Sequence, residues 1–301
     1  MIKLYTWVLY TVSRLYFGVN FKGSTSVLRM VFKWLPLLNI KVKHPLGFFW
    51  YLDSREALWT YLSSCERFTT RVIADIANKL ELAICIGANR GWYPLVINAV
   101  QPKIELKAFE PNSKIYKLLR ENIERNYATI ELHNFAIGNL HEVKDIYNYR
   151  DANDGMTTLY PTNWFSSDFK KLEETQVETL DSIIQSSGMM SRSTLLQMDI
   201  EGGEYAALQG AREFLKNYSP IVMCEINPVL LAAAGCTSSK LFQYMTSFGY
   251  EIYWIDERGS LYSQKEDEPC RHLELLPPGS GSNYIFLKEF HFFNFKCKVK
   301  S

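Results

Sequence analysis

The sequence lacks the spacings that the common metal sites require. Its 301 residues contain no Cys-x-x-Cys pair and no His-Glu-x-x-His, and the five histidines are dispersed. The six cysteines stand singly, a pattern that favours free thiols in a reducing compartment over a disulfide framework. We therefore expect a cytoplasmic protein without a metal site built from cysteine and histidine.

Long apolar runs and an excess of one charge are also missing. No run reaches the roughly 18 residues of a membrane-spanning helix, because Lys3 and Arg14 interrupt the apolar stretch from Ile2 to Val19. That stretch predicts an amphipathic helix that packs on the protein, with a helix on a membrane surface as the alternative. The net charge of +1 argues against broad capture of nucleic acid.

The composition is that of an ordinary globular protein, with 47% hydrophobic and 22% charged residues. The segment from residue 1 to about 50 is rich in aromatic and basic residues and is interrupted by glycine and proline. This composition predicts helical segments joined by loops. We divide the chain into an N-terminal helical extension (1–78), a central domain (79–290) and a C-terminal tail (291–301). The length suits one large α/β domain with such an extension.

From residue 54 the hydrophobic pattern predicts two helices and then an alternation of strands and helices. The expected strands are 82–86, 104–109, 130–135, 195–198, 220–224, 250–255 and 283–287. The expected helices are 92–100, 113–126 with Ser113 as its cap, 203–215 and 239–248. Parallel neighbours need crossover connections, so the alternation predicts a mostly parallel sheet with helices on both faces.

Two inserts interrupt this alternation. Alternating residues over 143–149, a turn at 153–155 and a short segment over 156–160 predict an antiparallel pair outside the parallel sheet. Residues 256–282 are polar and contain a cluster of proline and glycine, which predicts a loop.

A glycine-bearing turn follows the first expected strand, in the run Ile84-Cys85-Ile86-Gly87-Ala88-Asn89-Arg90-Gly91. Glu110 ends the next apolar run, about twenty residues further on. Glycines let a backbone approach a ligand closely, and a carboxylate at the second strand end can accept hydrogen bonds from ribose hydroxyls. The arrangement is typical of a site for an adenosine-containing ligand.

Polar and acidic residues also follow the later strands. Ligands of open α/β sheets bind at the carboxyl ends of the strands, so we expect one rim to be lined by Gly87, Asn89, Gly91, Glu110, Asn112, Asn134, Phe135, Ala136, Asp199, Glu201, Glu204, Glu225 and Asn227. Asp199 ends an apolar strand, where a carboxylate needs partners or a cleft. The other rim residues have structural alternatives. Glu201 and Glu204 could be acids in the first turn of a helix, and Phe135 could be a core residue.

In order and spacing, four segments resemble the FkbM family of S-adenosylmethionine-dependent methyltransferases: Ile86–Tyr93, Ala108–Asn112, Thr179–Asp181 and Met198–Glu204. Gly155–Leu159 and Asn283–Phe286 resemble less distinctive segments of that family. The resemblance implies a Rossmann-like class I methyltransferase fold, with a seven-stranded, mostly parallel sheet whose last strand is antiparallel. It also implies methylation of a hydroxyl on a sugar, glycan or natural product.

The resemblance implies roles for the motif residues as well. With S-adenosylmethionine as the cofactor, the expected binding residues are Cys85, Gly87, Ala88, Asn89, Gly91, Glu110, Asn134, Phe135 and Ala136. Among these, Glu110 is assigned the ribose and Phe135 the adenine, and the glycine turn is assigned the methionine end. Asp199, with Glu201 as second choice, is expected to orient or deprotonate the acceptor. A divalent metal at Asp199 is the alternative.

Cys85 departs from the family pattern, which has an acidic residue at this position. A neutral thiol does not attract an ammonium group as a carboxylate does. Three outcomes stay open: weaker cofactor binding, compensation by another carboxylate, or a scaffold that keeps the fold without turnover. A dehydrogenase ranks lower because the sequence has no Gly-x-Gly-x-x-Gly turn. Trp164 and Phe165, near the insert, are candidates for the acceptor side.

Overall fold

The computed structural model describes residues 40–62, 64–149, 156–163, 169–186, 193–256, 260–266, 281–289, 291 and 299–300. The expected helix over 2–19, the expected turn over 153–155, Trp164 and Phe165 lie outside the described residues. Within the described part, no helix is both long enough and apolar enough to cross a membrane.

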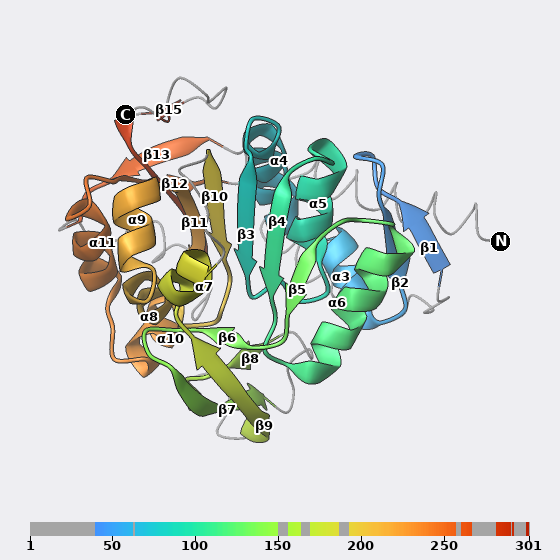
Figure 1. Ribbon diagram of the computed structural model, residues 1–301, viewed down its shortest axis with the longest axis horizontal. Coiled ribbons are helices and arrows are strands. Elements are labelled where there is room, and N and C mark those ends of the chain that lie inside the picture. The colour runs from blue at the N-terminus through green and yellow to red at the C-terminus, as the bar shows by residue number, and fades with distance from the viewer. Residues whose placement is uncertain are drawn as a thin grey trace, which may run out of the picture.

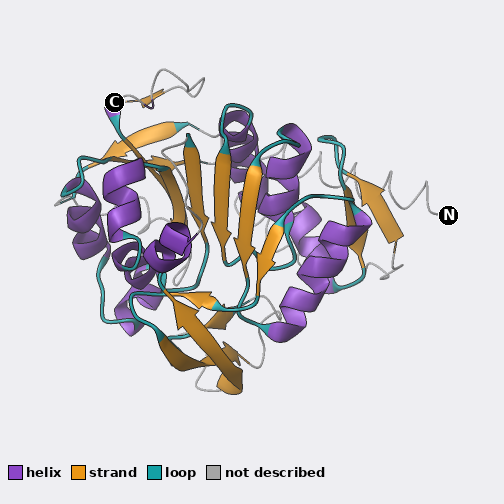
Figure 2. Ribbon diagram, in the orientation of Figure 1, coloured by secondary structure: helices purple, strands orange, loops and turns teal. Residues whose placement is uncertain are grey.

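A mixed sheet of nine strands, counted over the described residues, forms the centre of the molecule (Figures 1 and 2). In spatial order its strands are β15 (Val299–Lys300), β13 (Leu261–Gln264), β12 (Glu251–Ile255), β14 (Ser282–Leu287), β11 (Ile221–Ile226), β10 (Thr194–Met198), β3 (Leu82–Ile86), β4 (Glu105–Phe109) and β5 (Glu131–His133). Neighbours from β11 to β5 pair in parallel, whereas β14 runs antiparallel to both β11 and β12.

The expected count of seven strands is wrong. The strand over 283–287 is antiparallel, but it lies inside the sheet, and β13 and β15 extend the edge beyond β12. β13 falls in the region whose composition predicted a loop. Its Leu261 is fully buried and pairs with Ile255, so the burial of one side chain against β12 outweighs the polar composition of the segment.

Helices cover both faces of the sheet, and each face has its own buried cluster. One cluster contains side chains of α3 (Arg55–Leu62), α4 (Ser64–Ala77), α5 (Trp92–Val100) and α6 (Ser113–Arg125). The other contains side chains of α7 (Leu180–Ser186), α8 (Glu204–Gln209), α9 (Arg212–Tyr218), α10 (Pro228–Ala233) and α11 (Ser238–Thr246). Successive residues of β3 point to alternate clusters, which explains why this strand reads as one continuous apolar run.

Two expected helices differ in detail from the structure. The segment expected to form one helix over 203–215 is divided at Gly210, where a Cβ would lie 1.9 Å from the carbonyl oxygen of Gly138. α6 is capped by Asn112 rather than Ser113, because the Asn112 side chain accepts hydrogen bonds from the backbone N–H groups of Lys114 and Ile115.

Residues 40–52 form an antiparallel hairpin of β1 (Ile40–Lys43) and β2 (Phe49–Leu52), so the helical interpretation of this part of the chain is wrong. Ile40 and Val42 are buried and alternate with exposed lysines, which is the period of a strand. Trp50 of the hairpin packs edge-on against Trp92 of α5, with ring centroids 5.0 Å apart. The hairpin thereby joins the core of the sheet, and the boundary at residue 78 stays a prediction.

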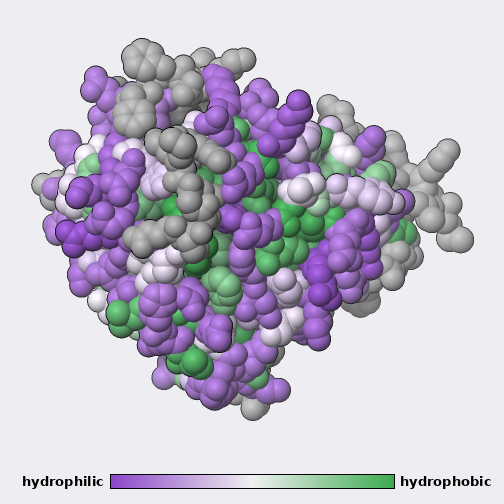
Figure 3. Space-filling model, in the orientation of Figure 1, coloured by the Kyte–Doolittle hydropathy of each residue, from purple (hydrophilic) through white to green (hydrophobic). Residues whose placement is uncertain are grey.

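A second, smaller sheet contains, in spatial order, β6 (Ala136–Ile137), β9 (Phe169–Glu178), β7 (Glu142–Tyr149) and β8 (Thr157–Thr158). The expected pairing of the segments over 143–149 and 156–160 is present as β7 and β8, whereas β9 is a strand that the sequence pattern missed. Figures 1 and 2 show this sheet beside the carboxyl ends of β3, β4 and β10. In the same orientation, Figure 3 shows hydrophobic residues near the middle of this face and polar residues around them.

Candidate functional site

A hollow lies where the carboxyl ends of β3, β4 and β10 meet the small sheet. It brings together residues from segments far apart in the sequence, and seven of the predicted site residues line it: Gly87, Asn89, Glu110, Phe135, Ala136, Asp199 and Glu201. Among the described residues that line it, three are carboxylates and none is basic. We name it the acidic hollow.

Gly87 fixes the turn that enters this hollow. Its φ of +75° favours glycine, and a Cβ at this position would lie 2.0 Å from the carbonyl oxygen of Asp199. The N–H groups of Gly87 and Ala88 both donate to the carbonyl oxygen of Phe109, at 2.9 Å. The turn after β3 is therefore held against the ends of both neighbouring strands, and a larger residue at Gly87 would push the loops apart.

The Glu110 carboxylate lies in the same turn network. One oxygen accepts a hydrogen bond from the backbone N–H of Asn89 at 2.9 Å, and the other accepts one from the N–H of Asn112 at 3.0 Å. Burial raises the pKa of Glu110 to about 7, although these two hydrogen bonds oppose the shift. A carboxylate oxygen can accept two hydrogen bonds, so each oxygen can still accept one from a ligand hydroxyl.

Two asparagines support Glu110 from outside the hollow. The Asn134 side chain donates to the carbonyl oxygens of Glu110 and Pro111, at 2.9 and 3.0 Å. The Asn112 amide donates to the Thr157 hydroxyl at 3.2 Å and so ties the end of β4 to the small sheet. Asn134 does not line the hollow; its hydrogen bonds fix the backbone that carries the Glu110 carboxylate.

An aromatic group forms one wall of the hollow. Phe109 stacks on His133 with ring centroids 4.6 Å apart, and Phe135 is tilted against both rings at 5.5 and 5.3 Å. Phe109 and Phe135 line the hollow together with Ile115 and Ile137. A flat apolar group would find favourable packing here, because its neighbours are hydrophobic.

Asp199 and Glu201 supply the other two carboxylates. Burial raises the pKa of Asp199, and a hydrogen bond with Glu225 opposes that shift. Burial also raises the pKa of Glu201 strongly, with further contributions from the charges of Asp199 and Glu204. Like charges held close together in a dry site favour protonation, so this part of the hollow is poised to take up a proton or a cation.

The backbone around these acids is unusual as well. Glu201 has a φ of +53° and Asn89 a φ of +48°, a region that non-glycine residues seldom adopt. The Glu201 carbonyl oxygen accepts a hydrogen bond from the Thr158 hydroxyl at 2.8 Å, which secures this conformation from the small sheet. Strained backbone of this kind is concentrated at functional sites.

Glu204 serves the loop rather than the hollow. It is buried, and its carboxylate accepts hydrogen bonds from the backbone N–H groups of Ile200 and Gly202, at 3.2 and 3.1 Å. Burial raises the pKa of Glu204 to about 7. Because Glu204 does not line the hollow, its position at the start of α8 supports the structural alternative for this residue.

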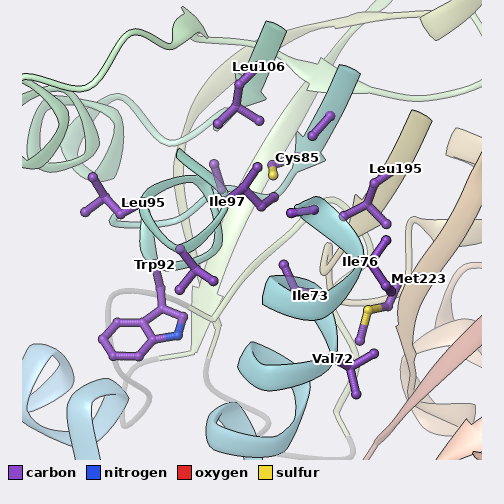
Figure 4. Close-up of a cluster of buried hydrophobic side chains, with 14 of the residues drawn as sticks. Val72, Ile73, Ile76, Cys85, Trp92, Leu95, Ile97, Leu106, Leu195 and Met223 are labelled. Atoms are coloured by element: carbon purple, nitrogen blue, oxygen red, sulfur yellow. The ribbon is translucent and has the colours of Figure 1, made fainter. Parts of the chain in front are cut away.

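Cys85 lies inside the sheet. Its side chain is fully buried, and Figure 4 shows it among hydrophobic side chains that include Ile97 and Leu195. Burial raises the pKa of the Cys85 thiol. The predicted cofactor residues that do not line the hollow are Cys85, Ala88, Gly91 and Asn134.

Sequence reasoning missed the part of the wall that comes from the small sheet. Ile146 of β7 and the run Thr157–Tyr160 line the hollow. The likeness of Gly155–Leu159 to a family segment was the signal for this run, but no strand pattern placed it at the rim. Within the described residues, no group of three or more His, Cys, Asp or Glu side chains could hold a metal ion.

The glycine turn after β3, the acid after β4 and the acids after β10 line one hollow. This arrangement at the strand ends of an α/β sheet is typical of a domain that binds an adenosine-containing ligand. The family model of the methyltransferase FkbM domain matches residues 86–252, more than half of the chain, so the chain belongs to the FkbM methyltransferase family. This confirms the family expected from the motifs. The class is that of an S-adenosylmethionine-dependent methyltransferase.

Solved structures with similar folds are distant in sequence. The methyltransferase FkbM from Methylobacillus flagellatus is 17% identical at a TM-score of 0.40, and the match covers 70% of this chain and 44% of that chain. An O-methyltransferase from Bacillus cereus, solved with S-adenosylhomocysteine, is 12% identical at a TM-score of 0.42, and the match covers 96% and 100% of the two chains. The comparison with curated proteins found no match.

Proposed function

We propose that this protein transfers a methyl group from S-adenosylmethionine to a hydroxyl group of a sugar, glycan or natural-product acceptor. The observation that carries the proposal is the convergence of Gly87, Glu110 and Asp199 on one acidic hollow in a chain of the FkbM family. This proposal includes the hydroxyl acceptor and the role of each residue in binding the cofactor or activating the acceptor.

The charge of the hollow suits this cofactor. S-adenosylmethionine carries a sulfonium and an ammonium group against one carboxylate, so a cavity lined by Glu110, Asp199 and Glu201 attracts it. The hollow also contains an acceptor without a partner, because Asn89 Oδ1 is buried and has no hydrogen bond within the described residues. The Asn89 side-chain oxygen is the group that would accept hydrogen bonds from the ammonium group, in place of an acid at position 85.

The remaining contacts follow from chemistry. Glu110 retains two free acceptor positions for the two ribose hydroxyls, and Phe135 offers an apolar ring to the adenine. Bound S-adenosylmethionine supplies an electrophilic methyl group. The chain then has to align the acceptor hydroxyl and remove its proton.

Asp199 is the residue that we assign to the acceptor. A carboxylate whose pKa is raised by burial is a stronger base than an exposed one, and it lies in the hollow beside the glycine turn. Its carboxylate oxygen would take the proton of the acceptor hydroxyl as the hydroxyl oxygen bonds to the methyl carbon, whose bond to the cofactor sulfur breaks to leave S-adenosylhomocysteine. Glu201 is the second choice, since it lines the same hollow two residues further on.

A binding scaffold without turnover is the second candidate function. The observation that favours it is the buried, neutral Cys85, which cannot supply the charge that the family's acid supplies. The scaffold retains the fold and the hollow but has little affinity for the cofactor.

Titration of the full chain with S-adenosylmethionine in a calorimeter separates the two candidates. We expect saturable binding, and a rise in Tm with cofactor concentration, because a ligand of the native state stabilises it. A screen of glycan, lipid and polyketide acceptors with methyl-labelled cofactor then tests turnover. No binding at millimolar cofactor would contradict the enzyme and favour the scaffold.

A further inference from the structure

A second hollow lies beside the acidic one, and we propose that it binds the anionic group of the acceptor, a sugar that carries a phosphate or a carboxylate. This inference rests on the proposed methyl transfer, because it concerns the acceptor of that reaction. Polar side chains dominate the lining of this second hollow: Glu142, Lys144, Tyr160, Tyr205, Gln209 and Lys240. We name it the basic hollow.

The two hollows are adjacent. Tyr160 lines both, and the loop after β10 contributes Glu201 and Gly203 to the acidic hollow and Gly202 to the basic one. An acceptor that extends across Tyr160 would therefore place one end near the carboxylates and the other end near the lysines. The reacting hydroxyl belongs to the first end, where Asp199 lies.

Lys240 is the cation best placed to receive an anion. Its side chain is exposed, and its ammonium lies 5.0 Å from the centre of the Tyr205 ring. It makes no ion pair with any described residue, so an incoming anion displaces no carboxylate from it. The Tyr205 ring contact restricts where the ammonium lies and keeps it at the basic hollow.

Lys144 is the second cation and is partly neutralised. Its ammonium lies 3.0 Å from a Glu142 carboxylate oxygen and 3.5 Å from the Tyr160 hydroxyl, which accepts a hydrogen bond from it. A bound anion competes with Glu142 for this lysine. The basic hollow therefore has a small net positive charge, enough to orient an anion and weak enough to release the product.

The neutral groups of the basic hollow indicate what carries the anion. Two phenols and the Gln209 amide, which accepts a hydrogen bond from the Asn139 amide at 3.5 Å, offer donors and acceptors to neighbouring hydroxyls. An apolar scaffold would leave these groups without partners. Phosphate and carboxylate share the chemistry that two ammonium groups recognise, so both are included as probes.

The test measures binding of small sugars to the chain saturated with S-adenosylhomocysteine. The probes are glucose 6-phosphate, glucuronate and neutral glucose, with inorganic phosphate as a minimal anion. We expect both charged sugars to bind at least fivefold more tightly than glucose, and added salt to weaken them. A preference for glucose 6-phosphate over glucuronate identifies phosphate as the anion, and the reverse identifies carboxylate.

Three variants locate the site. We expect Lys240→Met to weaken the charged sugars about fivefold or more and Lys144→Met to weaken them less. Lys103→Met is the matched control. Lys103 is exposed and precedes β4, so it lies at the amino ends of the strands, away from both hollows. The affinity for S-adenosylhomocysteine, measured on every variant, is expected to stay unchanged.

Equal affinity for glucose and the charged sugars, no saturable binding of phosphate or either charged sugar, or equal losses in Lys240→Met and Lys103→Met would each overturn the inference. If S-adenosylhomocysteine still binds in these cases, the proposed methyl transfer stands and only the anionic acceptor is lost. If S-adenosylhomocysteine does not bind the unmodified chain, the proposed function itself fails.

Discussion

The acidic hollow and the basic hollow differ in how their charges are held. In the acidic hollow the Glu110 carboxylate is buried and fixed by two backbone N–H groups at the end of a central strand. In the basic hollow the charge of Lys240 stands on an exposed side chain of α11, with the ammonium near the Tyr205 ring. The buried carboxylate can bind only a ligand that enters the hollow, whereas the exposed ammonium of Lys240 can attract an anion from solvent.

The two hollows also come from different parts of the fold. The acidic hollow depends on strand ends of the central sheet, and the small sheet closes it. The basic hollow is built from β7, the loop before it, Tyr160, α8, the turn after α10 and the start of α11. If the proposed function holds, strand ends of the central sheet supply the cofactor residues and Asp199, whereas the inserted sheet and the helices supply the residues for the anionic end of the acceptor.

Asp199→Asn gives the largest expected effect and tests whether the acidic hollow is catalytic as well as binding. We expect turnover to fall at least about 100-fold, because general base catalysis contributes that much, while cofactor affinity changes little. Asp75→Asn, on the exposed side of α4, is the control. Full methyl incorporation by Asp199→Asn would remove this residue from the mechanism.

Glu110→Ala tests the binding half of the same hollow. The variant loses the acceptor of two backbone N–H groups and of the proposed ribose contacts, so we expect cofactor affinity to fall at least tenfold in calorimetry. Glu121→Ala, which removes an exposed ion pair with Arg125 on α6, is the control. An unchanged affinity in Glu110→Ala would count against the ribose role.

The pH dependence of binding separates the hollows by charge. Burial raises the pKa of Glu110 to about 7, so the carboxyl group is mostly protonated at pH 6 and ionised at pH 8. We expect affinity for the cationic cofactor to rise about fivefold over this range, and affinity for S-adenosylhomocysteine, which lacks the sulfonium charge, to rise less. Glucuronate, whose own charge is constant here, is expected to bind the basic hollow with little change.

The free energy of unfolding of the protein without ligand is expected to fall as pH rises, opposite to the change in cofactor affinity. A carboxyl group whose pKa is raised in the folded state stabilises that state while it is protonated, and this contribution is lost as pH rises from about 4.5 to about 7. The free energy of unfolding is therefore expected to decline across this window and to decline less in Glu110→Gln. A steeper decline in the variant would contradict the assigned pKa.

Glu142→Gln is the smallest expected change and sharpens the account of the basic hollow. Removal of the carboxylate that lies 3.0 Å from the Lys144 ammonium frees this lysine for an anion. We expect glucuronate to bind about threefold more tightly, a gain within the range of a surface ion pair. Glu174→Gln, which alters a pair with Lys171 elsewhere on the small sheet, is the control. Weaker glucuronate binding would show that Glu142 contributes to the site.

The sequence predicted the central sheet better than its surroundings. β3 and α5 begin and end at the expected residues, because an apolar run buried on both faces and a glycine turn leave few alternatives. The hairpin over 40–52 and β13 were missed, since their pairing depends on contacts with the core that a local pattern does not contain. The strand β9 was missed because charged residues interrupt its apolar pattern and most of its residues are exposed or half-buried.

The same distinction holds for the site. Gly87, Glu110 and Asp199 could be found because strand ends of a parallel sheet share one edge. Tyr160 and Lys240 could not, because no periodicity relates the segment after β8, or α11, to that edge. Cys85 shows the limit of motif reasoning, since a position that the family pattern links to the cofactor is here a core residue beside Leu195.

A crystal structure of the full chain with S-adenosylhomocysteine would show whether the cofactor binds in the acidic hollow. We expect the ligand in the acidic hollow, with its ribose hydroxyls within hydrogen-bond distance of the Glu110 carboxylate and its adenine against Phe135. A ligand bound elsewhere, with Glu110 and Asp199 making no contact to it, would rule out the proposed cofactor site.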